Sequence, residues 1–204
     1  MYIPNLYKNE NQAEIEQFLN ENGFAILVNQ TNEKLWATHI PLIIGTNSND
    51  EKILIGHISK LNPQAKSFKQ NDEVLAIFSG SHSYISSSWY DHENVPTWNY
   101  LAVHVYGKVR LHTYEESIES LKKLVNKYEA KSEKPIRIED LSEKTMREAR
   151  GIVSFEIEIT SIEAQKKLSQ NRDDKNYQNI ISELEKTNEN QAIEIAKAMK
   201  KNRP

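Results

Sequence analysis

The segment 56–64 (GHISKLNPQ) combines residue types that can bind an anion. Asn62 and Pro63 are typical of the N-cap and first position of a helix, so the sequence predicts a helix of about ten residues from this point. The free amides at its start, together with Ser59, Lys60 and Asn62, could hold a phosphate group. The same residues could also form an ordinary capped helix with a solvent-facing lysine, and the pattern alone leaves both interpretations open.

Residues 82–106 gather flat rings and hydroxyl groups. Six of the aromatic side chains (3 Trp, 9 Tyr and 5 Phe in the whole chain) and three of the six His fall in this segment. Asp91 and Glu93 are the charged residues there before Lys108, although 27% of the chain is charged. Such a segment is typical either of a surface that holds a planar, polar molecule or of a core rich in Tyr and Trp.

Other reactive side chains lack the spacing that their chemistry requires. His82 and the residues 91–93 fit no strong metal-ligand template, which favours a solvated loop. His39 and His57 could contact a ligand or be satisfied core histidines. The serines of 86–88 are outside any nucleophile elbow, and no dinucleotide fingerprint or P-loop occurs. The hydrolase, kinase and Rossmann-dehydrogenase classes therefore lack support.

Length and composition limit the class of protein further. A chain of 204 residues predicts one domain, or one domain with a helical appendage. Its net charge of −3 does not favour a non-specific nucleic-acid binder, and the absence of Cys excludes disulfides and thiol chemistry. We find no signal peptide and no apolar run of the ~20 residues that span a bilayer, so a soluble cytoplasmic protein is expected.

The elements that must position these side chains follow from hydrophobic periodicity. Strands are expected over 24–29, 34–44, 52–59, 73–79, 83–90, 97–111 and 152–159. Besides the helix at Asn62, helices are expected over 11–22, 115–130, 142–149, 177–186 and 189–201. The order of elements predicts an α+β fold, an antiparallel barrel of six or seven strands with helices outside. The barrel would occupy residues 1–172, and residues 173–204 would form an extension of surface helices.

The strand over 97–111 separates two sets of side chains. Apolar residues at its odd positions form a barrel-interior set: Leu101, Val103, Val105, Val109 and Leu111. The even positions include Trp98, Tyr100, His104 and Tyr106, which point the other way. A row of rings on an outer face is typical of an interface or a ligand site.

Eight motifs that span nearly the whole chain occur in the order expected of one known family. They are 1–4 (MYIP), 37–42 (ATHIPL), 56–57 (GH), 62–64 (NPQ), 80–90 (GSHSYISSSWY), 95–100 (VPTWNY), 151–155 (GIVSF) and 167–172 (KLSQNR). With these motifs the sequence resembles the PaiB family, described as FMN-binding negative transcriptional regulators. The resemblance implies a flavin-binding split barrel like that of the pyridoxamine-phosphate oxidases, and a homodimer with FMN in a cleft between subunits.

The resemblance also implies which residues would bind the flavin nucleotide. The phosphate and ribityl chain would be contacted by Thr38, His39, Ser59, Lys60 and Asn62. The ring system would be flanked by Tyr84, Ser86, Trp98, Asn99 and Tyr100, and Gln170 and Arg172 would come from near the C-terminus of the same or the partner subunit. Lysine suits the phosphate, hydroxyl groups suit the ribityl chain, and rings suit the isoalloxazine.

The function implied by the resemblance is repression of degradative-enzyme and sporulation genes. No DNA-reading element in the sequence supports direct DNA binding. A flavin-dependent oxidoreductase, a haem-binding or haem-degrading split barrel, and an interaction module with a vestigial pocket remain alternatives. Because no general acid or base stands out, the sequence assigns no catalytic residue.

Overall fold

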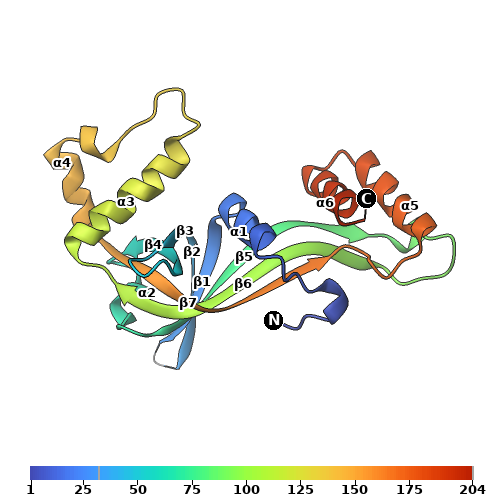
Figure 1. Cartoon of the computed structure of the whole chain (residues 1–204), viewed down its shortest axis with the longest axis horizontal. Helices are drawn as coiled ribbons and strands as arrows, with labels where there is room; N and C mark the ends of the chain where they lie inside the picture. The colour runs from blue at the N-terminus through green and yellow to red at the C-terminus, as the bar shows by residue number, and fades with distance from the viewer. Residues whose placement is uncertain (32, 204) are drawn as a thin grey trace. The chain divides into compact units, whose positions relative to one another are not determined.

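Seven strands form one open antiparallel sheet in the computed structural model, which describes residues 1–31 and 33–203 (Figure 1). The strands are β1 (Phe24–Thr31), β2 (Lys34–Pro41), β3 (Ile43–Thr46), β4 (Lys52–Ser59), β5 (Glu73–Ile85), β6 (Thr97–Leu111) and β7 (Ile152–Lys167). Their order in the sheet is β2-β1-β5-β6-β7-β4-β3. The predicted α+β class is confirmed.

Six α-helices and four short 3₁₀ turns accompany the sheet within the described residues. The helices are α1 (Gln12–Glu21), α2 (Pro63–Ser67), α3 (Tyr114–Glu129), α4 (Glu143–Met146), α5 (Asp174–Lys186) and α6 (Asn190–Asn202). The 3₁₀ turns are η1 (Asn5–Tyr7), η2 (Ser87–Trp89), η3 (Ile138–Asp140) and η4 (Arg147–Gly151). Of the described helices, none combines the length and the apolar character needed to cross a membrane.

The contacts divide the chain into two compact units. Unit 1 consists of Met1–Phe18, Phe78–His104 and Glu163–Pro204, and unit 2 consists of Leu19–Ile77 and Val105–Ile162. The three longest strands, β5, β6 and β7, contribute part of their length to each unit. The boundary after residue 172 stays a prediction, although α5 and α6 fall in the same unit as residues 78–104.

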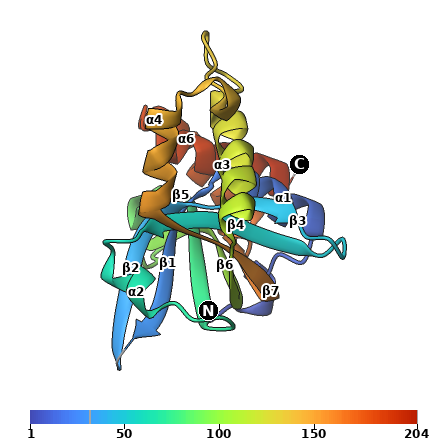
Figure 2. The ribbon, with the colours of Figure 1, turned by 90° about the vertical axis from the view of Figure 1, so that its left-hand side faces the viewer.

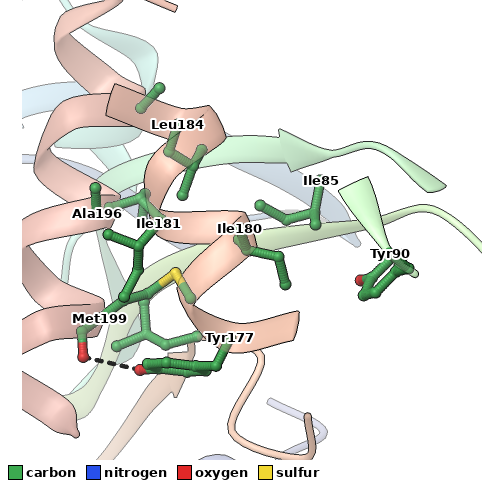
Figure 3. Packing of buried hydrophobic residues seen from close by; sticks show 11 residues of the cluster. Ile85, Tyr90, Tyr177, Ile180, Ile181, Leu184, Ala196 and Met199 are labelled. Atoms are coloured by element: carbon green, nitrogen blue, oxygen red, sulfur yellow. Dashed lines mark hydrogen bonds between the residues drawn. The ribbon is translucent and has the colours of Figure 1, made fainter. Parts of the chain in front are cut away.

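The C-terminal helices carry a core cluster of unit 1 (Figure 3). Tyr177, Ile180, Ile181 and Leu184 recur at helical spacing along α5 and are at most 2% exposed. They pack with Ile85 of β5 and with one face of α6. The two predicted helices are therefore confirmed, and a few well-spaced apolar residues are enough to bury one face of each while the other face stays exposed.

Unit 2 has its own core on both sides of β4. Phe68 meets Phe155 of β7 edge to face, with ring centroids 5.3 Å apart. On the other side, Leu124 of α3 packs against Ile43, Ile53 and Ile55. The helix α3 thereby covers β3 and β4.

Four predicted strands differ clearly from the structure. One continuous strand, β5, replaces the strands expected over 73–79 and 83–90, and 86–90 contains η2 instead. Gly80 lies inside this continuous strand, where a side chain would lie 2.6 Å from the Phe18 ring, so this glycine permits close packing of α1. The strand expected over 34–44 is divided at Leu42 into β2 and β3, and β7 continues eight residues beyond the expected end at Ile159.

Candidate functional site

The predicted phosphate-binding residues lie in unit 2, around the connection from β4 to α2. Asn62 is the N-cap of α2, where its Oδ1 accepts a hydrogen bond from the Gln64 amide at 2.9 Å. Its Nδ2 donates to Thr38 Oγ1 at 2.9 Å, which ties the cap to β2. Ser59 Oγ accepts from the Leu61 amide at 3.2 Å. The motif 59–62 therefore forms one hydrogen-bonded group with Thr38.

Lys60 supplies the positive charge of this group. Its exposed side chain donates from Nζ to the Arg150 carbonyl at 2.5 Å, and an ammonium has three N–H donors, so two remain for a ligand. The helix α2 has five residues, not the predicted ten, so its dipole is small and the lysine must carry most of the attraction for a phosphate. His39 is exposed and its ring stacks on Phe24 at 6.1 Å, which excludes the interpretation of a core histidine.

A buried amide fixes α2 onto the sheet beneath this group. Gln64 is fully buried and donates from Nε2 to the Leu27 carbonyl at 3.2 Å and to Asn29 Oδ1 at 3.0 Å. Both partners belong to β1. The start of α2, and with it Asn62, is thereby held in one position.

An aromatic surface, formed by His82, Tyr84 and Trp98, lies in unit 1. The Trp98 ring meets the Tyr84 ring edge to face at 5.8 Å and the His82 ring at 6.1 Å. Trp98 is 52% exposed and Tyr84 46% exposed, whereas Tyr100 is half-buried. The outward direction predicted for Trp98 is confirmed, and the exposed rings are suited to contact a planar molecule.

Three other predicted residues of unit 1 already form hydrogen bonds within the chain through their side-chain polar groups. Asn99 is fully buried, accepts from Ser169 Oγ at 3.0 Å and contacts the Met199 sulfur at 3.5 Å. Ser86 is the N-cap of η2. Gln170 closes its own turn, since Oε1 accepts from the Leu168 amide at 2.7 Å and Nε2 donates to the Lys166 carbonyl at 2.5 Å.

Arg172 has a buried group that fits a ligand. Its guanidinium lies over the Tyr90 ring at 4.9 Å. Among the described residues its Nε, which is inaccessible to solvent, has no hydrogen-bond partner, and the same holds for the Tyr90 hydroxyl. A buried donor without an acceptor costs about 1–3 kcal/mol, which an acceptor atom of a bound molecule would relieve.

The twelve predicted residues thus divide between the two units. Unit 2 contains Lys60 with the hydroxyl groups of Thr38 and Ser59, and unit 1 contains the exposed rings and the unsatisfied arginine. A phosphate needs the first set, whereas an isoalloxazine ring needs the second. The residue types that the structure exposes in each unit fit FMN.

The sequence did not reveal a charged network in unit 2, here called the Arg110 network. Arg110 donates from Nε to Glu156 at 2.7 Å and from Nη1 to Glu116 at 2.9 Å. His112 Nδ1 lies 3.0 Å from the hydroxyls of Ser154 and Ser120, and its Nε2 lies 3.4 Å from Glu156. Strand alternation predicted a polar face with Ser154 and Glu156, but these residues are buried.

The surroundings of the Arg110 network shift the pKa values of His112 and Glu156. Burial lowers the pKa of His112, although Glu156 opposes the shift. For Glu156, burial alone would raise the pKa, but hydrogen bonds from Arg110 and His112 hold it below its ordinary value. The network therefore contains an ionised carboxylate beside a neutral imidazole. The signal in the sequence was the alternation of Arg110, on β6, and His112, directly after it, opposite Ser154 and Glu156 on β7.

Comparison with known proteins identifies the family. The family model described as "Putative FMN-binding domain" matches residues 1–161. The protein named "Protease synthase and sporulation protein PAI 2" of Bacillus subtilis (strain 168) is 43% identical over 201 residues, which are 98% of this chain and 96% of that one.

Solved structures share the fold at low sequence identity. The FAD and haem binding protein from Mycobacterium smegmatis has a TM-score of 0.62 and 12% identity, over 79% of this chain and 73% of that chain. The flavocytochrome Anf3 from Azotobacter vinelandii has a TM-score of 0.61 and 14% identity, over 84% of this chain and 75% of that chain. The family model and the 43% identical relative show that the chain belongs to the PaiB family, whose FMN-binding domain model matches residues 1–161.

Proposed function

We propose that this protein is a homodimeric FMN-binding regulator that represses transcription of degradative-enzyme and sporulation genes. The observation that carries the proposal is the 43% identity, along 98% of the chain, with a protein whose name refers to protease synthesis and sporulation. The FMN-binding domain of the family supports the cofactor. Regulation by a flavoprotein would let the redox state of the flavin influence gene expression.

Lys60 and the groups beside it are proposed to bind the FMN phosphate. The Lys60 ammonium would add charge-assisted hydrogen bonds to those from the hydroxyls of Ser59 and Thr38. His39, exposed beside Thr38 on β2, would contact the ribityl chain. The hydrogen bond from Asn62 to Thr38 supports this assignment, because it holds two of the proposed contacts together.

The aromatic surface is proposed to contact the isoalloxazine ring. Tyr84 and Trp98 present exposed rings, and the unsatisfied Nε of Arg172 offers a donor to a carbonyl or phosphate oxygen. Asn99, Ser86 and Gln170 would then act by shaping the backbone rather than through their side-chain polar groups, which already have partners. Tyr100 would contribute from its half-buried position.

Absorbance and titration test the cofactor proposal. The purified protein should show the spectrum of oxidised flavin, or acquire it when FMN is added. Lys60→Ala should weaken FMN binding by roughly 1.5–3 kcal/mol, which raises Kd roughly 10- to 150-fold. Lys66→Ala, which removes an exposed lysine of α2, is the matched control and should bind like the wild type. Equal affinities would remove Lys60 from the site.

Transcript measurements test the regulatory proposal. Deletion of the gene should raise transcripts of degradative-enzyme and sporulation genes, and restoration of the wild-type gene should lower them again. A gel shift across a series of salt concentrations then asks whether the protein contacts DNA itself, because phosphate contacts weaken steeply with salt. Unchanged transcripts would contradict the regulatory role, whereas absence of a shift at low salt would make regulation indirect.

A flavin-dependent oxidoreductase is the second candidate function. The exposure of Tyr84 and Trp98 favours it, because a flavin against these rings could be reached by a second substrate. Oxidation of NAD(P)H by the FMN-loaded protein would support this function. A haem spectrum, with no uptake of FMN, would instead support the haem-binding alternative.

A further inference from the structure

Unit 2 contains a cavity of about 870 Å³ that the proposed FMN site does not use. Its walls come from the loop 46–49, from β4, β6 and β7, and from the first turns of α3. Figure 2 shows α3 beside β4. None of the twelve residues assigned to FMN lines the cavity, and its volume is in the range of small-molecule sites.

The floor of the cavity combines carboxylates with the edges of two buried isoleucines, Ile53 and Ile55, which are 2% and 3% exposed. In the antiparallel pairing of β4 with β7, Ile53 lies opposite Glu158 and Ile55 lies opposite Glu156. Directly opposed residues of paired strands share one face of the sheet. Ile118 of α3 adds a third apolar side chain. A ligand that fills the cavity would therefore contact isoleucine and carboxylate groups together.

Carboxylates outnumber cations in the lining. Five glutamates face two cationic side chains, Arg110 and Lys123. The carboxylates are Glu115, Glu116, Glu119, Glu156 and Glu158. The imidazole of His112 adds no charge near neutral pH, because burial lowers its pKa.

One of the two cationic side chains in the lining, Arg110, already has ion-pair partners. Arg110 is held between Glu116 and Glu156, with nitrogen to oxygen distances of 2.9 and 2.7 Å. Glu115 and Glu158, by contrast, form no ion pair with any residue that the structure describes. An anion, including the phosphate of FMN, would face unneutralised carboxylates, whereas a cation would complement them.

We propose that this cavity binds a small organic cation, namely a protonated amine attached to an apolar body. The ammonium group pairs with the carboxylates of Glu115 and Glu158, and the apolar body lies against the partly exposed Ile118, next to the buried Ile53 and Ile55. The Arg110 network is a positioning device, since it holds α3 to β6 and β7 and so keeps the cavity open. This site is separate from the proposed FMN site and does not depend on it.

Methyl NMR of the full chain with labelled isoleucine tests the ligand class. Three probes of similar shape are titrated: benzylamine, which is cationic, benzyl alcohol, which is neutral, and benzoate, which is anionic. Benzylamine should give saturable shifts of the Ile53, Ile55 and Ile118 methyl signals, and benzyl alcohol should bind roughly fivefold more weakly or worse. Benzoate should give no saturable shift of these signals.

Charge variants test the residues. Glu115→Gln combined with Glu158→Gln should weaken benzylamine binding roughly fivefold or more. Glu133→Gln, an exposed change of the same kind outside the cavity, should bind like the wild type. Similar affinity for all three probes, shifts confined to other methyl groups, no saturable shift with benzylamine, or wild-type affinity in the double variant would overturn the proposal. FMN titration of the same samples keeps the two sites distinguishable, because neither variant should change FMN affinity.

Discussion

Buried polar side chains play two different roles in this protein. Gln64 and Asn99 hydrogen-bond to neighbouring parts of the chain, as does the half-buried Gln170, and so fix the backbone on which the proposed site is built. Arg172 keeps a buried Nε that has no partner among the described residues. Such a donor destabilises the unliganded protein, and a bound acceptor would relieve the cost. Arg172 should therefore matter more for FMN binding than for folding.

Substitution of Arg172 separates its contribution to FMN binding from its contribution to folding. Arg172→Ala should weaken FMN binding by about 1.5–3 kcal/mol, the range of a hydrogen bond from a charged group, with a smaller change in the free energy of unfolding. Arg203→Ala is the control, because Arg203 also lies over a tyrosine ring, that of Tyr177, at 4.9 Å. Fluorescence titration measures the affinity, and urea unfolding measures stability. An equal loss of affinity in both variants would assign the effect to packing.

The buried imidazole of His112 should make stability depend on pH. Burial lowers its pKa below 6.5, so the folded protein favours the neutral ring while the unfolded chain still takes up a proton. The unfolded state then binds more protons, and the free energy of unfolding should fall as the pH decreases from about 7.5 to about 5.5. Burial also lowers the pKa of His57 and His104, so these residues act in the same direction.

His112→Asn tests this contribution by urea unfolding at several pH values. The variant should be less stable at neutral pH, because the hydroxyls of Ser154 and Ser120 lose their shared partner. Its stability should also fall less between neutral and mildly acidic pH. A slope in His112→Asn equal to that of the wild type would show that His112 does not titrate differently on folding.

At the scale of secondary-structure elements, the limits of strands and helices were predicted accurately where apolar and polar residues alternate regularly. The strands Lys52–Ser59 and Thr97–Leu111 have the predicted limits, and the helices near the C-terminus begin and end within three residues of prediction. Errors arose where one residue type has two uses. The strands expected over 73–79 and 83–90 are one strand, in which Gly80 permits a close approach of Phe18. Asn62-Pro63 indicated a helix of about ten residues but starts one of five. Local sequence does not contain the tertiary contact that decides between such uses.

The sequence proposed a set of site residues without separating their roles. Family motifs contain residues that bind a ligand and residues that hold the backbone, because loss of either would damage the site. The sequence thus placed Asn99 and Lys60 in one set, although Asn99 is fully buried and Lys60 is exposed. The Arg110 network escaped prediction because it joins β6, β7 and α3, which are distant in sequence.

The pair of C-terminal helices should be a main source of stability in unit 1. Tyr177 of α5 is fully buried and donates from its hydroxyl to the Met199 carbonyl of α6 at 2.8 Å. Tyr177→Phe should lower the free energy of unfolding by about 0.5–1.5 kcal/mol through the lost hydrogen bond, and Tyr177→Ala by about 3–5 kcal/mol through the added cavity. Tyr2→Phe, at a residue 88% exposed, is the control. Urea unfolding that ranks the two Tyr177 variants equally would contradict this assignment.

At the scale of the whole molecule, the exposed rings of unit 1 argue for a partner. Trp98 and Tyr84 lie together on the surface although large rings are costly to leave in water. A homodimer that buries them would explain why charged residues are few in the segment 82–106. If the same rings also contact FMN, dimerisation and FMN binding must be linked, because a ligand that favours the dimer lowers its dissociation constant.

Trp98→Glu tests the interface and the linkage in one experiment. A carboxylate among the rings would need desolvation in the dimer, so the variant should sediment as a monomer at concentrations where the wild type is a dimer. Leu35→Glu places the same charge at another apolar position, 72% exposed, and should leave the dimer intact. Sedimentation velocity with detection at the flavin absorbance shows in the same run whether FMN travels with the protein. A monomeric variant that still carries FMN would show that the rings serve dimerisation and not FMN binding. A variant that remains a dimer would show that the aromatic surface is not the interface.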